Sequence, residues 1–322
     1  MVTTTGDGEP LPISIESTDV AELEAAVGIL RALDYRQGGG FCRDAVRVVK
    51  TASLLLHWGT VPAPLRARLY TVLADVHNLL GWTEFDVGRG EPARRRFERA
   101  LEIAAEAGND SLVANIRYRL GRVYLHRHDV DGALAEFARG RAAASRSDSR
   151  RALAILTANE AWAFAMGGDE RAALTRLAEA EAAFAEAGSW PEPRPWEAFF
   201  REPDMAAMRG TVLTELATAV AARHSGEAIT QLTGAADGYG ADMARSRSLT
   251  LIMLAQNHAL RGDFEEATRI GAEAVDLAGQ LSSVRPKDRL VPLERLLDRH
   301  RGDAAVRELA DRIARYRAEP LL

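Results

Sequence analysis

The chain has 322 residues, of which 47% are apolar and 27% are charged, and its formal net charge is −5. This composition predicts a folded protein with a sizeable core and excludes wholesale disorder. A net negative charge provides none of the overall basic field that drives non-specific binding to nucleic acids. The single cysteine, Cys42, excludes an intrachain disulfide framework.

Residues 1–18 are polar and contain no basic-then-apolar leader, so we expect a disordered N-terminal tail. No apolar run approaches the roughly 20 residues that span a bilayer. We therefore expect a cytoplasmic protein with no membrane segment.

Residues 19–60 predict an opening helical hairpin that departs from the later repeats. Asp19 and Glu22 have the spacing of a helix cap ahead of an amphipathic helix at 20–33. The glycine-rich sequence at 34–40 predicts a turn, and a second helix is expected at 41–58.

Helical-hairpin repeats are predicted for residues 61–282. The aligned alanines Ala93, Ala133 and Ala173 are 40 residues apart, and each belongs to a unit with two apolar stripes at helical spacing, separated by a two-residue break. Two further copies follow before residue 282. Because one hairpin leaves a face unburied, we expect the copies to stack into an α-solenoid.

Gly-Asp pairs such as Gly168-Asp169 occupy the breaks within the hairpins. The glycine suits the left-handed conformation that ends a helix, and the aspartate can cap the next one. Small residues such as Gly121 are expected where paired helices cross, beside a later aromatic residue such as Phe137.

This pattern resembles the tetratricopeptide repeat. The small residue, the aromatic Tyr124 or Phe164 three residues later, the Gly-Asp turn and the Ala-x-x-x-Phe-x-x-Ala of the second helix all match. The resemblance implies an all-α protein with a right-handed α-solenoid. The 40-residue period exceeds the usual 34, which longer helices would explain.

Three segments resemble more particularly the C-terminal tetratricopeptide region of helix-turn-helix transcriptional regulators from high-GC Gram-positive bacteria. They are LRALDYRQGGGFCRDAV (30–46), LLGWTEFDVGRG (79–90) and WEAFFREPDMAAMRG (196–210). The resemblance implies a regulatory or sensor module linked to transcription. Only about 18 residues precede the first predicted helix, too few for a three-helix DNA reader. We therefore expect no direct binding to nucleic acid.

The concave surface is the candidate binding site because the first helix of each hairpin lines the inside of such a superhelix. Aromatic and polar side chains alternate there, which suits a peptide or a small amphipathic ligand. Trp82 and Trp162 could instead be core residues, whereas Arg122 and His126 have little use in a core. The candidate ligand-binding residues are Asn78, Trp82, Asp86, Tyr118, Arg122, His126, Asn159 and Trp162.

Catalytic and metal-binding motifs are not evident. His126 and His128 are close enough to suggest a metal site, but helix capping already explains the neighbouring Asp129. The glycines at 38–40 lack the preceding strand and the Lys-Ser/Thr of a phosphate loop. We interpret Cys42 as a packed residue rather than a reactive thiol. The sequence therefore predicts no enzyme, metal or cofactor.

An insertion at residues 188–203 separates the third and fourth hairpins. Its alternating prolines prevent a helix, and Trp196, Phe199 and Phe200 then share one face of a helical turn. This stripe predicts a plug that seals the joint between the two hairpins. The alternative is a groove wall or lid that contacts the ligand.

Residues 283–322 predict C-terminal capping helices, at 288–300 and 304–317, with a charged outer face.

These features predict a non-catalytic regulatory scaffold that binds a peptide, a small metabolite or a partner protein in its concave groove. Binding would act by changing the curvature of the superhelix or by self-association into a homodimer. The alternative is a constitutive protein–protein assembly scaffold with no small ligand.

Overall fold

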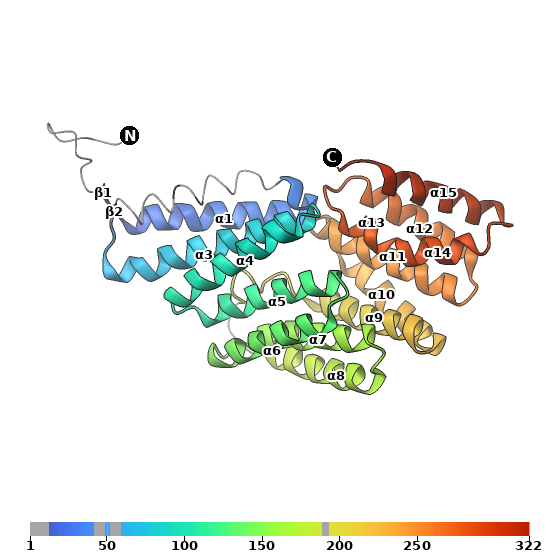
Figure 1. Cartoon of the computed structure of the whole chain (residues 1–322), viewed down its shortest axis with the longest axis horizontal. Helices are drawn as coiled ribbons and strands as arrows, with labels where there is room; N and C mark the ends of the chain where they lie inside the picture. Colours follow the sequence, from blue (N-terminus) through green and yellow to red (C-terminus); the bar gives the residue numbers. More distant parts are fainter. Residues whose placement is uncertain (1–12, 42–48, 50, 52–58, 189–192, 322) are drawn as a thin grey trace.

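The computed structural model describes residues 13–41, 49, 51, 59–188 and 193–321. Helices dominate this part of the chain, and consecutive helices pack in pairs (Figure 1). The predicted α-solenoid of helical hairpins is confirmed. The helices are α1 (Ser17–Gln37), η1 (Gly39–Phe41), α3 (Ala63–Asp86), α4 (Gly90–Glu106), α5 (Asp110–His126), α6 (Val130–Arg146), α7 (Arg150–Met166), α8 (Glu170–Ala187), α9 (Glu202–Ala219), η2 (Ala222–His224), α10 (Ser225–Gly238), η3 (Ala241–Met243), α11 (Ala244–Leu260), α12 (Phe264–Ala278), α13 (Arg285–Arg289), α14 (Val291–Asp298) and α15 (Ala304–Ala318).

The fold begins earlier than the sequence predicts. Two short strands, β1 (Ile13–Ser14) and β2 (Gly59–Thr60), pair in parallel, and the side chain of Ile15 is buried. The prediction of a disordered tail is therefore wrong for residues 13–18. The cap of α1 also differs, because the Asp19 carboxylate accepts a hydrogen bond from the Glu16 N–H at 2.8 Å. Residues 1–12, Cys42 and most of the helix expected at 41–58 lie outside the described residues.

The turns within the hairpins have the expected backbone. Gly168 and Gly262 have φ angles of +78° and +79°. The Asp169 side chain accepts a hydrogen bond from the Ala172 N–H at 3.0 Å and so caps α8. In the α5–α6 turn, His128 takes the left-handed conformation at φ 60°, so the turn forms there without glycine.

Small residues lie at the helix crossings, as predicted. A Cβ atom on Gly121 would lie 2.3 Å from Cε1 of Phe137, and one on Gly81 would lie 2.8 Å from Cε1 of Phe97. Both phenylalanine side chains are fully buried. The aromatic ring of the second helix therefore fills the space that glycine leaves in the first.

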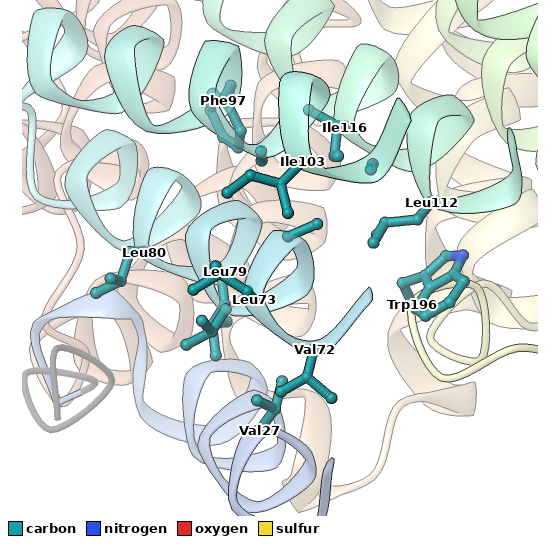
Figure 2. Packing of buried hydrophobic residues seen from close by; sticks show 14 of the residues in the cluster. Val27, Val72, Leu73, Leu79, Leu80, Phe97, Ile103, Leu112, Ile116 and Trp196 are labelled. Carbon is teal, nitrogen blue, oxygen red and sulfur yellow. The ribbon is translucent and has the colours of Figure 1, made fainter. Parts of the chain in front are cut away.

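The insertion does not act as one plug. Trp196 belongs to the hydrophobic cluster of α1, α3, α4 and α5, at the edge near Leu112 (Figure 2). Its indole N–H donates to the Ser111 hydroxyl at 3.0 Å. Phe200 instead packs edge-on against Phe184 of α8, with ring centroids 5.6 Å apart. The aromatic stripe is thus divided between two clusters, because Phe199 packs beside Phe200, with ring centroids 6.0 Å apart, and not beside Trp196.

The two ends of the solenoid meet through buried ionic contacts, which we call the closing contact: Asp34, Asp86, Arg245 and Ser283. The Arg245 guanidinium donates to Asp34 at 3.0 Å and to Asp86 at 3.1 Å, and the Ser283 hydroxyl donates to Asp86 at 2.9 Å. Both carboxylates are fully buried. Figure 1 shows α1 and α3 reaching the part of the molecule that carries α11 and α13.

The glycines at 38–40 permit this approach. A Cβ on Gly39 would lie 2.8 Å from the Thr83 Cα, and one on Gly40 would lie 1.8 Å from the Ser282 Oγ. Gly38 has φ +89°. The glycines at 38–40 therefore do more than form a turn. Larger side chains at these positions would push the two ends of the solenoid apart.

The C-terminal region is divided differently from the prediction. The helix expected at 288–300 is split between α13 and α14, with Pro292 in the first turn of α14. Proline lacks the N–H that a continuous helix would need at that position. The helix expected at 304–317 is present as α15.

We expect Phe137→Ala to lower the free energy of unfolding by about 3–5 kcal/mol, because it leaves a cavity against Gly121. Urea denaturation measures the change. Leu174→Ala, at an exposed leucine, is the control and should change stability by no more than about 0.5 kcal/mol. Equal losses in the two variants would contradict the assigned packing.

We expect Arg245→Ala to cost about 3–5 kcal/mol, because it leaves Asp34 buried without its cation and Asp86 with the more distant Arg285 at 3.5 Å. The control is Arg247→Ala in the same helix, whose ion pair with Glu273 is largely exposed and should contribute at most about 1 kcal/mol. Denaturation of both variants at pH 7 compares them, and an equally small loss in each would show that the closing contact is dispensable.

Candidate ligand-binding pocket

A pocket lies inside the solenoid, between the hairpins and the closing contact. It contains about 860 Å³ of empty space, part of it open to solvent. Its walls come from α1, α3, α5, α7, α9, α11 and α13 and from the 193–201 segment. Because α1 and α3 lie on one side of the closing contact and α11 and α13 on the other, the pocket depends on that contact.

Trp82 forms the first aromatic surface of the pocket. The Cζ atoms of Arg119 and Arg285 lie 5.2 Å and 5.0 Å from its ring centroid. At these distances the electron-rich ring face attracts both guanidinium groups. Tyr118 stacks beside Trp82, with centroids 6.4 Å apart.

Trp162 repeats this arrangement two hairpins further on, in α7. The Cζ atoms of Arg122 and Arg289 lie 4.4 Å and 4.8 Å from its ring centroid. The Trp162 indole N–H and the Arg289 guanidinium both donate to Glu215, at 3.1 Å and 3.0 Å. Arg122 makes a longer hydrogen bond of 3.4 Å to the Asn159 side-chain oxygen.

The arginines of the pocket are unequally neutralised. Among the described residues, no carboxylate lies within ion-pair distance of Arg119 or Arg122. Arg285 lies 3.5 Å from Asp86, which Arg245 already binds more closely. The pocket therefore has an excess of positive charge.

Burial makes these charges costly. It lowers the pKa of Arg285 to about 9, against the attraction of Asp86 and together with repulsion from Arg122 and Arg245. Burial also lowers the pKa values of Arg119 and Arg122. An anion placed among these groups would replace the solvation that they lose on folding.

An apolar wall faces into the same pocket from α9, α11 and the 193–201 segment. Phe199 stacks on Tyr118, with ring centroids 6.0 Å apart and an angle of 20° between the rings. Methionine side chains adapt to irregular ligand shapes. The other apolar lining residues are Phe200, Ala207, Met208, Met243, Leu249 and Met253.

Asp204 is the acidic residue of the described lining. Its carboxylate accepts hydrogen bonds from the Arg201 N–H and the Tyr239 hydroxyl, both at 3.1 Å. Burial raises the pKa of Asp204 to about 6, although these hydrogen bonds oppose the shift. The side chain therefore caps α9 and also places a titratable group in the pocket.

A second depression adjoins the pocket and shares Arg122, Trp162, Arg285 and Arg289 with it. His126 lies there, 3.1 Å from Asp288 and edge-on to Phe85. The two depressions share walls from α5 and α13, and we refer to them together as the groove.

The structure divides the predicted groove residues into two groups. Asn78 and Asp86 are fully buried with protein partners, because Asn78 donates to Asn115 at 2.9 Å and Asp86 belongs to the closing contact. The residues of the other group face the groove. They are Trp82, Tyr118, Arg122, Asn159 and Trp162 in the pocket and His126 in the second depression.

The insertion is divided in the same way. Phe199 and Phe200 line the pocket, whereas Trp196 packs in the hydrophobic cluster away from it. Within the described residues, no group of three or more His, Cys, Asp or Glu side chains could hold a metal ion. No helix in the same part of the chain is both long and apolar enough to cross a membrane.

Sequence reasoning missed several lining residues. Arg119 was detectable, since it lies three residues before Arg122 on the same helix face. Arg285 and Arg289 share a face of α13 by their spacing, but only the closing contact brings them to the pocket. The remaining missed residues whose position depends on that contact are Tyr35, Met243 and Arg245.

No family model matches the chain, and no curated protein matches it in sequence. Among solved structures, the chain is similar to a Rap protein in a complex with competence and sporulation factor. The TM-score is 0.55 with 11% identity, over 92% of this chain and 87% of that one. This similarity supports a tetratricopeptide-like helical fold.

We expect Asp204→Asn to alter the pH dependence of stability. Because the pKa of Asp204 is raised from 3.8 to about 6, the folded state keeps a proton between these pH values that the unfolded state has released. The stabilisation is complete below pH 4 and is lost as the pH rises through 6. The free energy of unfolding of the variant, relative to that of the parent, should therefore increase as the pH rises from 4 to 7.

Urea denaturation of both proteins at pH 4.5, 5.5 and 7 gives the difference in free energy of unfolding. Other titrating groups, such as His77, affect both proteins alike. A difference that does not change with pH would contradict the assigned proton.

Proposed function

We propose that this protein is a non-catalytic regulatory scaffold that binds a peptide or a small metabolite in the central pocket. The observation that supports it is that two tryptophan rings of the pocket, Trp82 and Trp162, each have two arginine guanidinium groups within 5.2 Å of the ring centroid. Guanidinium groups buried without carboxylate partners are costly to a structure, so their convergence on one hollow favours ligand binding over packing. Asp204, the acidic residue of the described lining, is held by its hydrogen bonds to the Arg201 N–H and the Tyr239 hydroxyl.

A regulatory output follows from where the ligand contacts lie. Arg285 and Arg289 are on α13, which begins directly after Ser283 of the closing contact. Trp82 is one helical turn before Asp86 of the same contact. A ligand that bridges α5 and α13 would bind the closed form better than an opened one, and so would shift the population toward closure.

The output itself is proposed to be a change in the outer surface that a partner protein recognises. A link to transcription rests on the resemblance to the helix-turn-helix regulators. The Rap protein of similar fold is seen in a complex with competence and sporulation factor. A solenoid of this kind can therefore hold a bound factor, which is consistent with the proposal.

The alternative, a constitutive assembly scaffold without a small ligand, requires a groove that lacks convergent polar groups. The arginines of the pocket argue against it, and homodimer formation is not needed for the proposed mechanism.

We expect Arg122→Ala and Trp82→Ala each to weaken ligand binding roughly 10-fold or more, since each removes a charged or aromatic contact. A library of short synthetic peptides and metabolites is first screened by thermal shift, and the hits are measured by calorimetry. Arg117→Ala is the control, because Arg117 is on the same helix but pairs with Glu136 outside the pocket. Hits that bind both pocket variants as tightly as the parent would refute the pocket as the binding site.

A further inference from the structure

The positive charge of the pocket lies on two elements, α5 and α13. Arg119 and Arg122 come from α5, and Arg285 comes from α13. Arg119 is almost fully buried, and its guanidinium donates a hydrogen bond to the backbone oxygen of Asn78 at 3.0 Å. The guanidinium groups of Arg122 and Arg285 are close enough to repel each other, and Asp86, the carboxylate near Arg285, is bound more closely by Arg245. The bidentate geometry of guanidinium matches a carboxylate.

Apolar side chains cover the opposite elements. Met208 on α9, Met243 before α11, and Leu249 and Met253 on α11 present thioether and aliphatic groups. Phe199 adds a ring that is stacked on Tyr118. A ligand that satisfied only the arginines would leave this wall exposed to water inside the pocket.

The negative groups around the pocket limit the ligand to a single anionic charge. Asp204 lies in the lining, and Glu215 and Asp288 lie in the adjoining depression. Glu215 already neutralises Arg289 at 3.0 Å. A second negative charge on the ligand would meet these carboxylates rather than free arginines.

Building on the proposed function, we propose that the pocket binds an amphipathic monocarboxylate. Its carboxylate contacts Arg122 and Arg285, and its apolar body lies on the wall formed by Phe199 and the methionines. The C-terminal carboxylate of a short apolar peptide and a free organic acid share this chemistry.

Pairs of probes that differ in having a carboxylate or an amide test whether the pocket binds a negative charge. Octanoate is compared with octanamide, and the peptide Ala-Leu-Phe is compared with its C-terminal amide, by calorimetry at low salt. We expect at least one acid to bind the protein at least 10-fold more tightly than its amide. If only the peptide acid does so, the source is a peptide C-terminus. If only octanoate does so, the source is a free organic acid.

The apolar wall is tested by chain length. From hexanoate to decanoate, affinity should rise about fourfold for each methylene, as expected when the chain leaves water. Leu249→Ala should reduce this increment, whereas the Arg117→Ala control should leave it unchanged. Octyl phosphate, which carries two charges at pH 8, should bind more weakly than a carboxylate of equal chain length.

Several outcomes would overturn the inference. They are equal binding of acid and amide, tighter binding of octyl phosphate, and binding by none of the probes. If an acid and its amide bind equally but both lose affinity in Arg122→Ala, the preference for a carboxylate is refuted, while the pocket remains the binding site. Acid binding that persists in both Arg122→Ala and Trp82→Ala would instead refute the proposed function.

Discussion

The buried contact of Arg245 with Asp34 and Asp86 is the constraint on which the rest of the structure depends. Two fully buried carboxylates carry a large desolvation penalty unless a cation and further donors satisfy them. Arg245 provides the cation, while Ser283 and the Gly39 N–H provide donors to Asp86. These groups come from four separate parts of the chain. The desolvation penalty of the carboxylates is therefore offset only when the two ends adopt this relative placement. The same placement forms the pocket.

The arginines near this contact have different roles because their surroundings differ. Arg245 is neutralised by two carboxylates and stabilises the fold. Arg122 instead contacts the Asn159 amide oxygen and the Trp162 ring. Stacking on an aromatic ring compensates a cation only partly. Repulsion from Arg245 and Arg289 adds to the burial that lowers the pKa of Arg122. The cations of the pocket are thus only partly compensated by the protein, and a bound anion would offset the remaining cost.

The parts of the fold and of the pocket that could be predicted from the sequence are those that depend on local patterns. The hairpins follow from short-range rules, because the glycine turn, the aspartate cap and the small residue at the crossing lie within one repeat. The same helical periodicity placed Trp82 and Arg122 on an inward face. Periodicity does not say what lies across from that face, which is why Asp86 was taken for a ligand contact although Arg245 occupies it. Arg285 and Arg289 were missed for the converse reason, since α13 approaches α5 only after the two ends have met.

The closing contact and the pocket are coupled by their covalent arrangement. Ser283 precedes Arg285 by two residues, and the Val284 N–H donates to the backbone oxygen of Asp86 at 2.8 Å. Any opening that moved α13 away from α5 would therefore break the backbone contact to α3 and separate the arginines from the tryptophans together. Linkage requires that the effect be reciprocal, so a ligand that is bound more tightly by the closed form must stabilise closure by the same free energy. In the proposed mechanism, the short segment from Ser283 to Arg289 would therefore couple occupancy of the pocket to closure of the solenoid.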